Sequence, residues 1–188
     1  MRKRVLEKIE LHLKLVNEFK ETGIKKILSV SNIIVESLRK GGIIFLCGNG
    51  GSAADAQHVA GEFIGRFQLE RNTMAAISLS TDTSVLTCIG NDYGFDYIFS
   101  RQLEGLIKKD DILWVFSTSG MSINIINACK VANIKKAKVI AFIGKSGSKI
   151  EKIADVCFCV ETSVTSTIQE IHQLAYHVIC GLVEEKLS

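Results

Sequence analysis

Apolar side chains recur with two different periods along this chain, and the two periods separate helices from strands. In the first forty residues the spacing is helical, carried by two sets of positions: Leu6, Ile9, Leu13 and Val16, then Ile27, Val30, Ile34 and Leu38. Charges at Glu7, Lys8 and Glu10 interrupt the first set and give it an amphipathic pattern. The pattern predicts two leading helices with a break near Thr22 and Gly23.

Five short apolar runs follow, each typical of a buried parallel strand. They occupy residues 43–47, 75–79, 112–116, 139–143 and 156–160. Helical character marks the segments between and after them: 53–66, 84–107, 122–133 and a long last helix over 167–187. Strands alternating with helices predict a three-layer α/β domain whose parallel sheet is covered on both faces. Ligands of such sheets bind at the carboxyl ends of the strands, so the residues directly after each run matter most.

Composition and charge narrow the class of protein only slightly. The chain has 188 residues, no proline and no linker-like stretch, which fits one domain over residues 1–188. Its net charge of +3 is too small to indicate a nucleic-acid partner. The charged start lacks the apolar core of a signal peptide, and no run reaches the ~18 apolar residues of a membrane span. The six cysteines form no CxxC pair, so we expect neither a disulfide framework nor a thiol metal site, and we expect a cytoplasmic protein.

The loop after the first apolar run reads GNGGSAADAQH. Gly48, Gly50 and Gly51 permit a sharp turn, and Ser52 is expected to cap the helix that follows. Backbone N–H groups at the start of a helix bind anions, so this loop predicts an anion site. The same residues match the loose dinucleotide fingerprint G-x-G-x-x-[GA], but the acidic residue that should end the second strand is missing, which argues against a dinucleotide.

A second loop, STSGMS, follows the third run and is rich in hydroxyl groups. Ser117, Thr118, Ser119 and Ser122 surround a single glycine at the start of a helix. Several short donors suit a phosphate monoester, and the alternative is an ordinary Ser/Thr cap and turn. The later GKSGSK at 144–149 resembles the tail of a P-loop, but Val139 stands where that motif needs glycine, so it is not a Walker motif.

The loops GNGGS and STSGMS, together with IQEIH at 168–172, resemble the sugar isomerase (SIS) family. The resemblance extends over nearly the whole chain, including the two leading helices. It implies a five-stranded parallel sheet of the doubly wound, flavodoxin-like type and a sugar phosphate as ligand. It also implies a homotetramer with sites at subunit contacts, in which the helices of residues 1–40 pack between subunits.

An aldose–ketose isomerase needs a general base, a second acid or base, and a group that holds the negative charge of an enediolate. The helix after the first loop supplies His58 and Glu62, whose spacing of four places them on one face. Arg66 follows one turn later and is able to pair with Glu62 or reach a ligand. His12, on the leading helix, is expected to be an ordinary structural residue.

The strings QHVAGEFIGRF and QEIHQLAYH are similar to the branch of the SIS family that isomerises heptose phosphates. In that branch the positions matching Glu62 and His177 form the acid/base pair. One Zn²⁺ per subunit is held by the positions matching His58, Glu62, Gln169 and His177. Glutamine is an unusual zinc ligand, and Gln169 and His177 are separated by roughly 12 Å of helix, which favours a site shared between subunits.

The same branch implies two groups of substrate-binding residues. Ser52, Ser117, Ser119 and Ser122 correspond to the phosphate contacts. The remaining contacts correspond to Asn49, Gly50, Gly51, Glu62, Arg66, Asn91, Asp92, Thr118 and Gln169. Ser166 and Thr167 stand where many relatives carry a polar and charged pair, so one substrate contact near them does not carry over.

The reaction implied is conversion of sedoheptulose 7-phosphate to D-glycero-D-manno-heptose 7-phosphate, which opens the supply of heptose for bacterial surface polysaccharide. One alternative is a non-catalytic phosphosugar-binding regulator resembling the DnaA initiator-associating protein. Those relatives lack the carboxylate and the histidine found here at Glu62 and His177. The other is an arabinose-5-phosphate isomerase, which usually carries appended regulatory domains for which this chain has no room.

Overall fold

The computed structural model describes all 188 residues and contains one five-stranded parallel sheet. The strands are β1 (Ile44–Gly48), β2 (Ala76–Ser78), β3 (Ile112–Ser117), β4 (Lys138–Ile143) and β5 (Val156–Cys159). Their order across the sheet is β2-β1-β3-β4-β5, and every neighbouring pair is parallel. Every predicted strand is confirmed within one or two residues, and so is the doubly wound α/β class.

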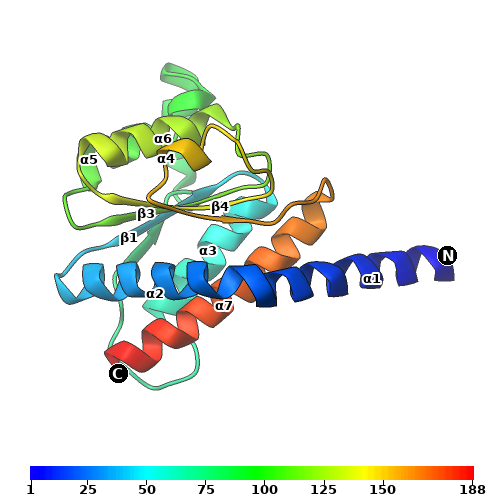
Figure 1. Ribbon diagram of the computed structural model, residues 1–188. Helices are drawn as coiled ribbons and strands as arrows, with labels where there is room; N and C mark the ends of the chain where they lie inside the picture. The colour runs from blue at the N-terminus through cyan, green and yellow to red at the C-terminus, as the bar shows by residue number, and fades with distance from the viewer.

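Helices cover both faces of the sheet, which gives three layers (Figure 1). One face is covered by α2 (Ile24–Arg39), α3 (Gly51–Ile64) and the long α7 (Thr165–Leu187). The other face is covered by α5 (Ser100–Leu106) and α6 (Ile123–Ile134), while α4 (Thr83–Asp92) adds the buried Ile89 to the core on this side. A separate apolar core lies on each face of the sheet, because the continuous apolar strands alternate their side chains between the two layers.

The predicted break near Gly23 is wrong. Helix α1 (Arg2–Glu18) continues through a π-helical turn (Phe19–Gly23) into α2, and the backbone remains in the right-handed helical region. A side chain at Gly23 would overlap the ring of Phe19, which packs edge-on against Phe158 of β5 with ring centroids 5.5 Å apart. Glycine is therefore required here for close packing, and the helical backbone continues through it without a break.

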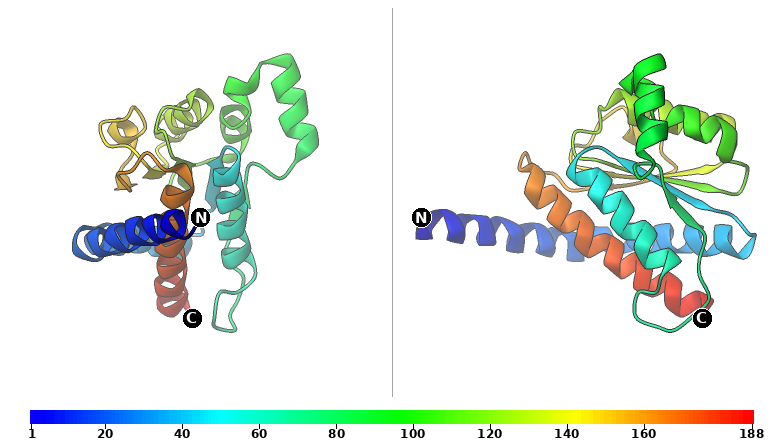
Figure 2. Two further views of the ribbon diagram at one scale, coloured as in Figure 1. Left: turned by 90° about the vertical axis from the view of Figure 1, so that its right-hand side faces the viewer. Right: turned by 180° about the vertical axis from the view of Figure 1, so that it is seen from behind.

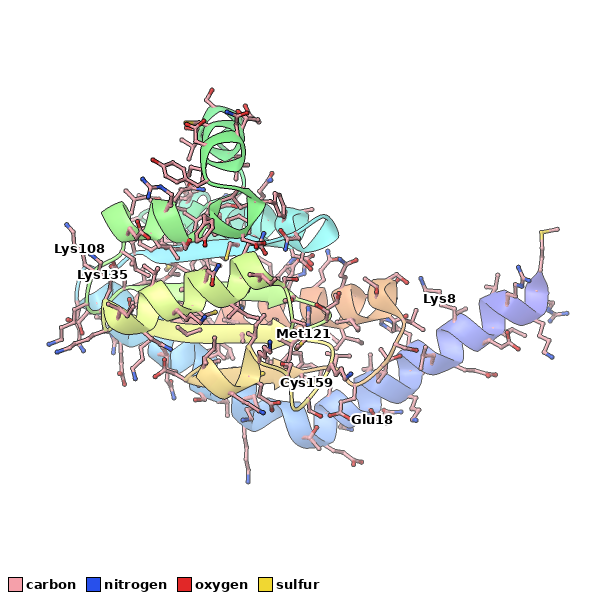
Figure 3. The ribbon with its side chains drawn as sticks, turned by 90° about the horizontal axis from the view of Figure 1, so that it is seen from above. Lys8, Glu18, Lys108, Met121, Lys135 and Cys159 are labelled. Atoms are coloured by element: carbon pink, nitrogen blue, oxygen red, sulfur yellow. The ribbon has the colours of Figure 1, made fainter.

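Helix α1 extends beyond the sheet as the free end of this long helix (Figures 1 and 2). Its apolar positions Val5, Leu6, Ile9 and Leu13 are exposed, whereas four apolar side chains of α2 are buried: Ile27, Val30, Ile34 and Val35. Lys8 of α1 is labelled in Figure 3, and its ammonium group forms an ion pair of 2.8 Å with Glu170 in the first turns of α7. None of the helices has both the length and the apolar character that a membrane span requires.

The segment predicted as one helix over 84–107 is interrupted. Helix α4 begins after Asp82, whose carboxylate accepts a hydrogen bond of 3.0 Å from the N–H of Val85, and ends at Asp92. Gly94 then adopts a φ of 96°, which no helix continues, and a short 3₁₀ turn (Phe95–Tyr97) leads to α5. Helix α4 consequently stands apart from the sheet (Figure 2).

Candidate active site

The loop after β1 turns at Gly50, whose φ of 56° only glycine adopts readily. Gly50 is the N-cap of α3, and Ser52 lies inside the first turn, buried, with no capping hydrogen bond, so the expected capping role of Ser52 is wrong. With Gly50 as the N-cap, α3 begins at Gly51, two residues before the position at which it would begin if Ser52 were the cap. The exposed N–H groups of Gly50 and Gly51 have no partner and lie at the positive end of α3, which fits the predicted anion site.

The hydroxyl-rich loop lies beside this turn because β1 and β3 are neighbours in the sheet. Ser122 is the N-cap of α6, and its Oγ lies 3.5 Å from Oγ of Ser117 at the end of β3. The side-chain amides of Asn49 and Asn124 exchange two hydrogen bonds, of 3.0 and 2.9 Å, and so join the two loops. Asn124 was not among the predicted residues, because only the folded chain places it opposite Asn49.

The third loop, at 144–149, supports the second loop from behind. The N–H of Gly144 donates to the carbonyl of Thr118 at 3.0 Å, and the N–H of Ile150 donates to the carbonyl of Gly120 at 3.2 Å. Gly120 has a φ of 63°, and a side chain there would overlap Ser148. The GKSGSK segment therefore holds the shape of the hydroxyl-rich loop.

Replacing Ser117 with alanine is expected to weaken binding of a sugar phosphate by about tenfold or more, since a hydrogen bond to a charged group contributes ~1.5–3 kcal/mol. Calorimetric titration with a sugar phosphate measures this. The control is Ser84→Ala on the exposed first turn of α4, which should leave the affinity unchanged. Equal affinities of Ser117→Ala and the unchanged protein would remove Ser117 from the phosphate site.

The side chains of His58, Glu62 and His177 converge where α3 packs against α7. Nε2 of His58 lies 3.0 Å from Oε1 of Glu62 and 3.4 Å from Nε2 of His177. Ligand atoms from all three residues lie within 4.8 Å of one another. The spacing of four on α3 thus places His58 and Glu62 together as expected, and the fold adds His177.

This donor set fits a metal ion. Imidazole nitrogen and carboxylate oxygen are common zinc ligands, and two nitrogens at ~2.0–2.1 Å from a tetrahedral ion lie roughly 3.3 Å apart, close to the separation seen here. Burial, and then the neighbouring His58, lower the pKa of His177, while Glu62 opposes them. His177 is therefore neutral at neutral pH, as a ligand must be.

Gln169 lies in the first turns of α7, eight residues before His177, and packs against the first loop. Its amide packs on Gly51, where a side chain would overlap it, and it makes no hydrogen bond with the His58–Glu62–His177 cluster. Arg66, Asn91 and Asp92 also lie outside the cluster. Arg66 faces Glu70 at 3.6 Å rather than Glu62, and Asn91 bonds Asp92 at 2.8 Å on the exposed end of α4.

Two residues behind His58 were missed by the sequence analysis. The hydroxyl of Tyr176 lies 3.1 Å from Nδ1 of His58 and 3.5 Å from Oδ1 of Asp55. Burial raises the pKa of Asp55 to about 6, against the opposing effects of Tyr176 and His58. The spacing of Asp55 one turn before His58 was the available signal. His172, by contrast, is fully buried in the core, where burial lowers its pKa to about 4.

A buried ion pair fixes the segment that follows α3. Glu184 of α7 accepts hydrogen bonds from the N–H groups of Phe67, Gln68 and Leu69, at 2.7–2.9 Å, and from Nε of Arg71 at 3.0 Å. Arg71 in turn donates to the carbonyl of Glu62 at 2.7 Å. The pair therefore holds the end of α3, from which Glu62 projects into the cluster.

An α/β protein with loops that present hydroxyls and free N–H groups at strand ends, and with a His–Glu–His cluster further along α3, has the features expected of a phosphosugar-binding protein. The SIS domain family matches residues 9–144, and the chain belongs to that family.

Within the family the chain groups with the phosphoheptose isomerases. The phosphoheptose isomerase of Aliarcobacter butzleri (strain RM4018) is 44% identical over 188 residues, which is 100% of both chains. The structure of phosphoheptose isomerase GmhA from Neisseria gonorrhoeae superposes with a TM-score of 0.92 at 38% identity, over 98% of each chain. A phosphoheptose isomerase from Francisella tularensis gives a TM-score of 0.94 at 33% identity, over 97% of each chain.

Proposed function

We propose that this protein converts sedoheptulose 7-phosphate to D-glycero-D-manno-heptose 7-phosphate, the entry step of heptose supply for bacterial surface polysaccharide. The observation that carries the proposal is the His58–Glu62–His177 cluster, two residues of which lie on the helix that starts at the first glycine loop, together with the hydroxyl-rich loop on the neighbouring strand. Similar chains that cover its whole length are phosphoheptose isomerases. The direct test is incubation with sedoheptulose 7-phosphate, with appearance of the aldose heptose phosphate followed by NMR.

The two loops bind the phosphate end of the substrate. The N–H groups of Gly50 and Gly51 and the hydroxyls of Ser52, Ser117 and Ser122 are within the two neighbouring loops, and Ser119 and Thr118 extend the hydroxyl set. A phosphate monoester accepts hydrogen bonds on several oxygens at once, so these uncharged donors together compensate its charge. The sugar chain then extends along Asn49 and Gln169 toward the cluster.

Glu62 and His177 carry the proton transfer. Isomerisation moves a proton between adjacent carbons through an enediol, so one group removes the proton while another acts on the sugar oxygens. Oε1 of Glu62 faces His58, whereas Oε2 has no hydrogen-bond partner and is free to act as the base. Neutral His177 serves as the second acid or base through its other ring nitrogen, because its Nε2 faces His58 at 3.4 Å and is the nitrogen that would hold a metal.

The cluster would hold a zinc ion through His58, Glu62 and His177, with Gln169 as a fourth candidate ligand. When bound, zinc supplies positive charge that stabilises negative charge developing on the sugar oxygens. The two oxygens of Glu62 allow this residue to face the ion and the substrate together. Gln169 reaches the ion only by leaving its place against Gly51.

Replacing His177 with glutamine is expected to weaken zinc binding by more than about 100-fold, since even outer partners of a ligand contribute 10–100-fold. Competition with a chromophoric chelator measures the dissociation constant. His12→Gln is the matched control, because His12 lies on α1, 3.3 Å from Glu170, outside the cluster. Unchanged zinc affinity in the His177 variant would remove this residue from the ligand set.

The active form is a homotetramer in the cytoplasm, with sites at subunit contacts. Two features support the shared site. The apolar stripe of α1 is uncovered in the single chain, and Arg66, Asn91 and Asp92 lie away from the cluster of their own chain. Packing of the helices of residues 1–40 between subunits would cover the stripe and bring these side chains to a neighbour's site.

A further inference from the structure

We propose that Asp55 and Tyr176 form an outer hydrogen-bonded chain that keeps the proton of His58 on Nδ1 and leaves Nε2 free to bind a cation with Glu62 and His177. Neither residue touches the substrate in this scheme, so both are positioning residues. The inference rests on the metal site of the proposed function and adds a mechanism that sets its affinity.

The first step is the position of the Tyr176 hydroxyl. The side chain of Tyr176 is fully buried, and its ring packs edge-on against the ring of His58 with centroids 5.5 Å apart. Its oxygen lies between Nδ1 of His58, at 3.1 Å, and Oδ1 of Asp55, at 3.5 Å. The hydroxyl therefore faces one imidazole and one carboxylate and no other polar group.

The second step follows from counting hydrogens. An ionised carboxylate only accepts hydrogen bonds, and a phenol has a single hydrogen to donate. When that hydrogen points to Asp55, the phenol oxygen accepts from His58, which requires the proton on Nδ1. The opposite order would turn a lone pair of the phenol oxygen toward the carboxylate, which is repulsive.

The third step concerns the other side of the imidazole ring. Glu62, at 3.0 Å from Nε2 of His58, attracts the ring proton to Nε2, where it would block a metal. The outer chain pulls the proton in the opposite direction. Hydrogen bonds of this kind fix the tautomer of metal-binding histidines and raise their affinity.

The fourth step concerns the half-buried carboxylate of Asp55. Its Oδ2 is buried and has no hydrogen-bond partner, so Tyr176 is the main compensation for a carboxylate that is costly to bury. An asparagine would avoid that cost. A carboxylate, unlike an amide, cannot donate a hydrogen bond, and this property sets the direction of the chain.

The test measures zinc affinity at pH 8 for Tyr176→Phe and Asp55→Asn. Each is expected to raise the dissociation constant by about 10–100-fold. Asp55→Asn retains the shape and removes a buried charge, yet its amide can donate to Tyr176, turn the phenol toward His58 and impose the wrong tautomer. The double variant should bind zinc no more weakly than the single variant with the lower zinc affinity, because either change breaks the same hydrogen-bonded chain. Tyr97→Phe, at an exposed tyrosine, is the control.

A second readout is the Nδ1–H proton of His58 in the zinc-loaded protein, which should exchange with water faster in Tyr176→Phe than in the unchanged chain. Zinc affinities within twofold of the unchanged protein, or effects that multiply in the double variant, would overturn the inference. So would an unchanged protein that binds no zinc and isomerises its substrate in chelator, an outcome that leaves the reaction intact. Tight zinc binding with the expected losses but no turnover would support the chain and overturn the proposed reaction.

Discussion

Glu62→Gln is expected to reduce the turnover of sedoheptulose 7-phosphate by about 10³-fold, within the 10²–10⁴-fold that a positioned acid or base contributes. The variant keeps the size of the side chain and its place on α3, but the amide has no basic oxygen to remove a proton. Turnover is measured by NMR under zinc saturation, so that a weaker metal site does not account for the loss.

The matched control is Glu104→Gln, an exposed glutamate of α5, which should turn over as the unchanged chain does. More than a tenth of the activity left in Glu62→Gln would assign the base to another group. An unchanged protein that binds the sugar phosphate, contains zinc and turns nothing over would favour the regulatory alternative. That alternative is disfavoured at present because Glu62 and His177 are both in place.

Glu184→Gln is expected to destabilise the fold by about 3–5 kcal/mol, the usual effect of removing one partner of a buried ion pair. Arg71 and Glu184 are 4% and 2% exposed, so Arg71 would keep its hydrogen bonds to backbone carbonyls but would be left buried without an opposite charge. The glutamine would also lose acceptor capacity for the three N–H groups of residues 67–69. Urea unfolding at pH 7 measures the change, and Glu185→Gln, at the exposed neighbouring position, is the control.

The same pair gives a pH dependence with a definite sign. Burial raises the pKa of Glu184, but the N–H donors of Leu69, Gln68 and Phe67 and then the charge of Arg71 outweigh it, so the pKa is lowered. A group with a lowered pKa contributes stability above its unfolded value, ~4.3, and loses it as the pH falls through the folded value. The difference in the free energy of unfolding between the unchanged protein and Glu184→Gln should therefore be largest at pH 7 and become smaller as the pH falls. A difference that does not change down to pH 3 would contradict this assignment.

The fold was predictable because it depends on periodicity. Each strand is a continuous apolar run, since parallel strands are buried on both faces, and such runs are visible without knowing which strands pair. The two wrong predictions about where a helix is interrupted both concern glycine. At Gly23 the residue fits the ring of Phe19 inside a continuing helix, whereas at Gly94 a positive φ ends the helical segment. The residue type is the same at both positions. Only the neighbouring side chains and the backbone conformation show whether glycine allows close packing or makes a turn.

The candidate site divides in the same way. The sequence alone predicted candidate anion loops at Gly50–Ser52 and Ser117–Ser122, because these residues directly follow strands, and it paired His58 with Glu62 through the helical repeat. Those are local relations, set by spacing along one strand or one helix. The resemblance to the SIS family added His177, which no local spacing connects to His58.

The tertiary structure alone brought together residues distant in the chain. Packing of α3 on α7 places Tyr176 and Asp55 behind His58, and Glu184 beneath the end of α3, while the neighbouring strands β1 and β3 place Asn124 opposite Asn49. Each of these contacts depends on the rotation of one helix against another and on strand order. Neither helix rotation nor strand order leaves a periodic pattern in the sequence. Contacts within one strand end or one helix could therefore be predicted, and these long-range contacts could not.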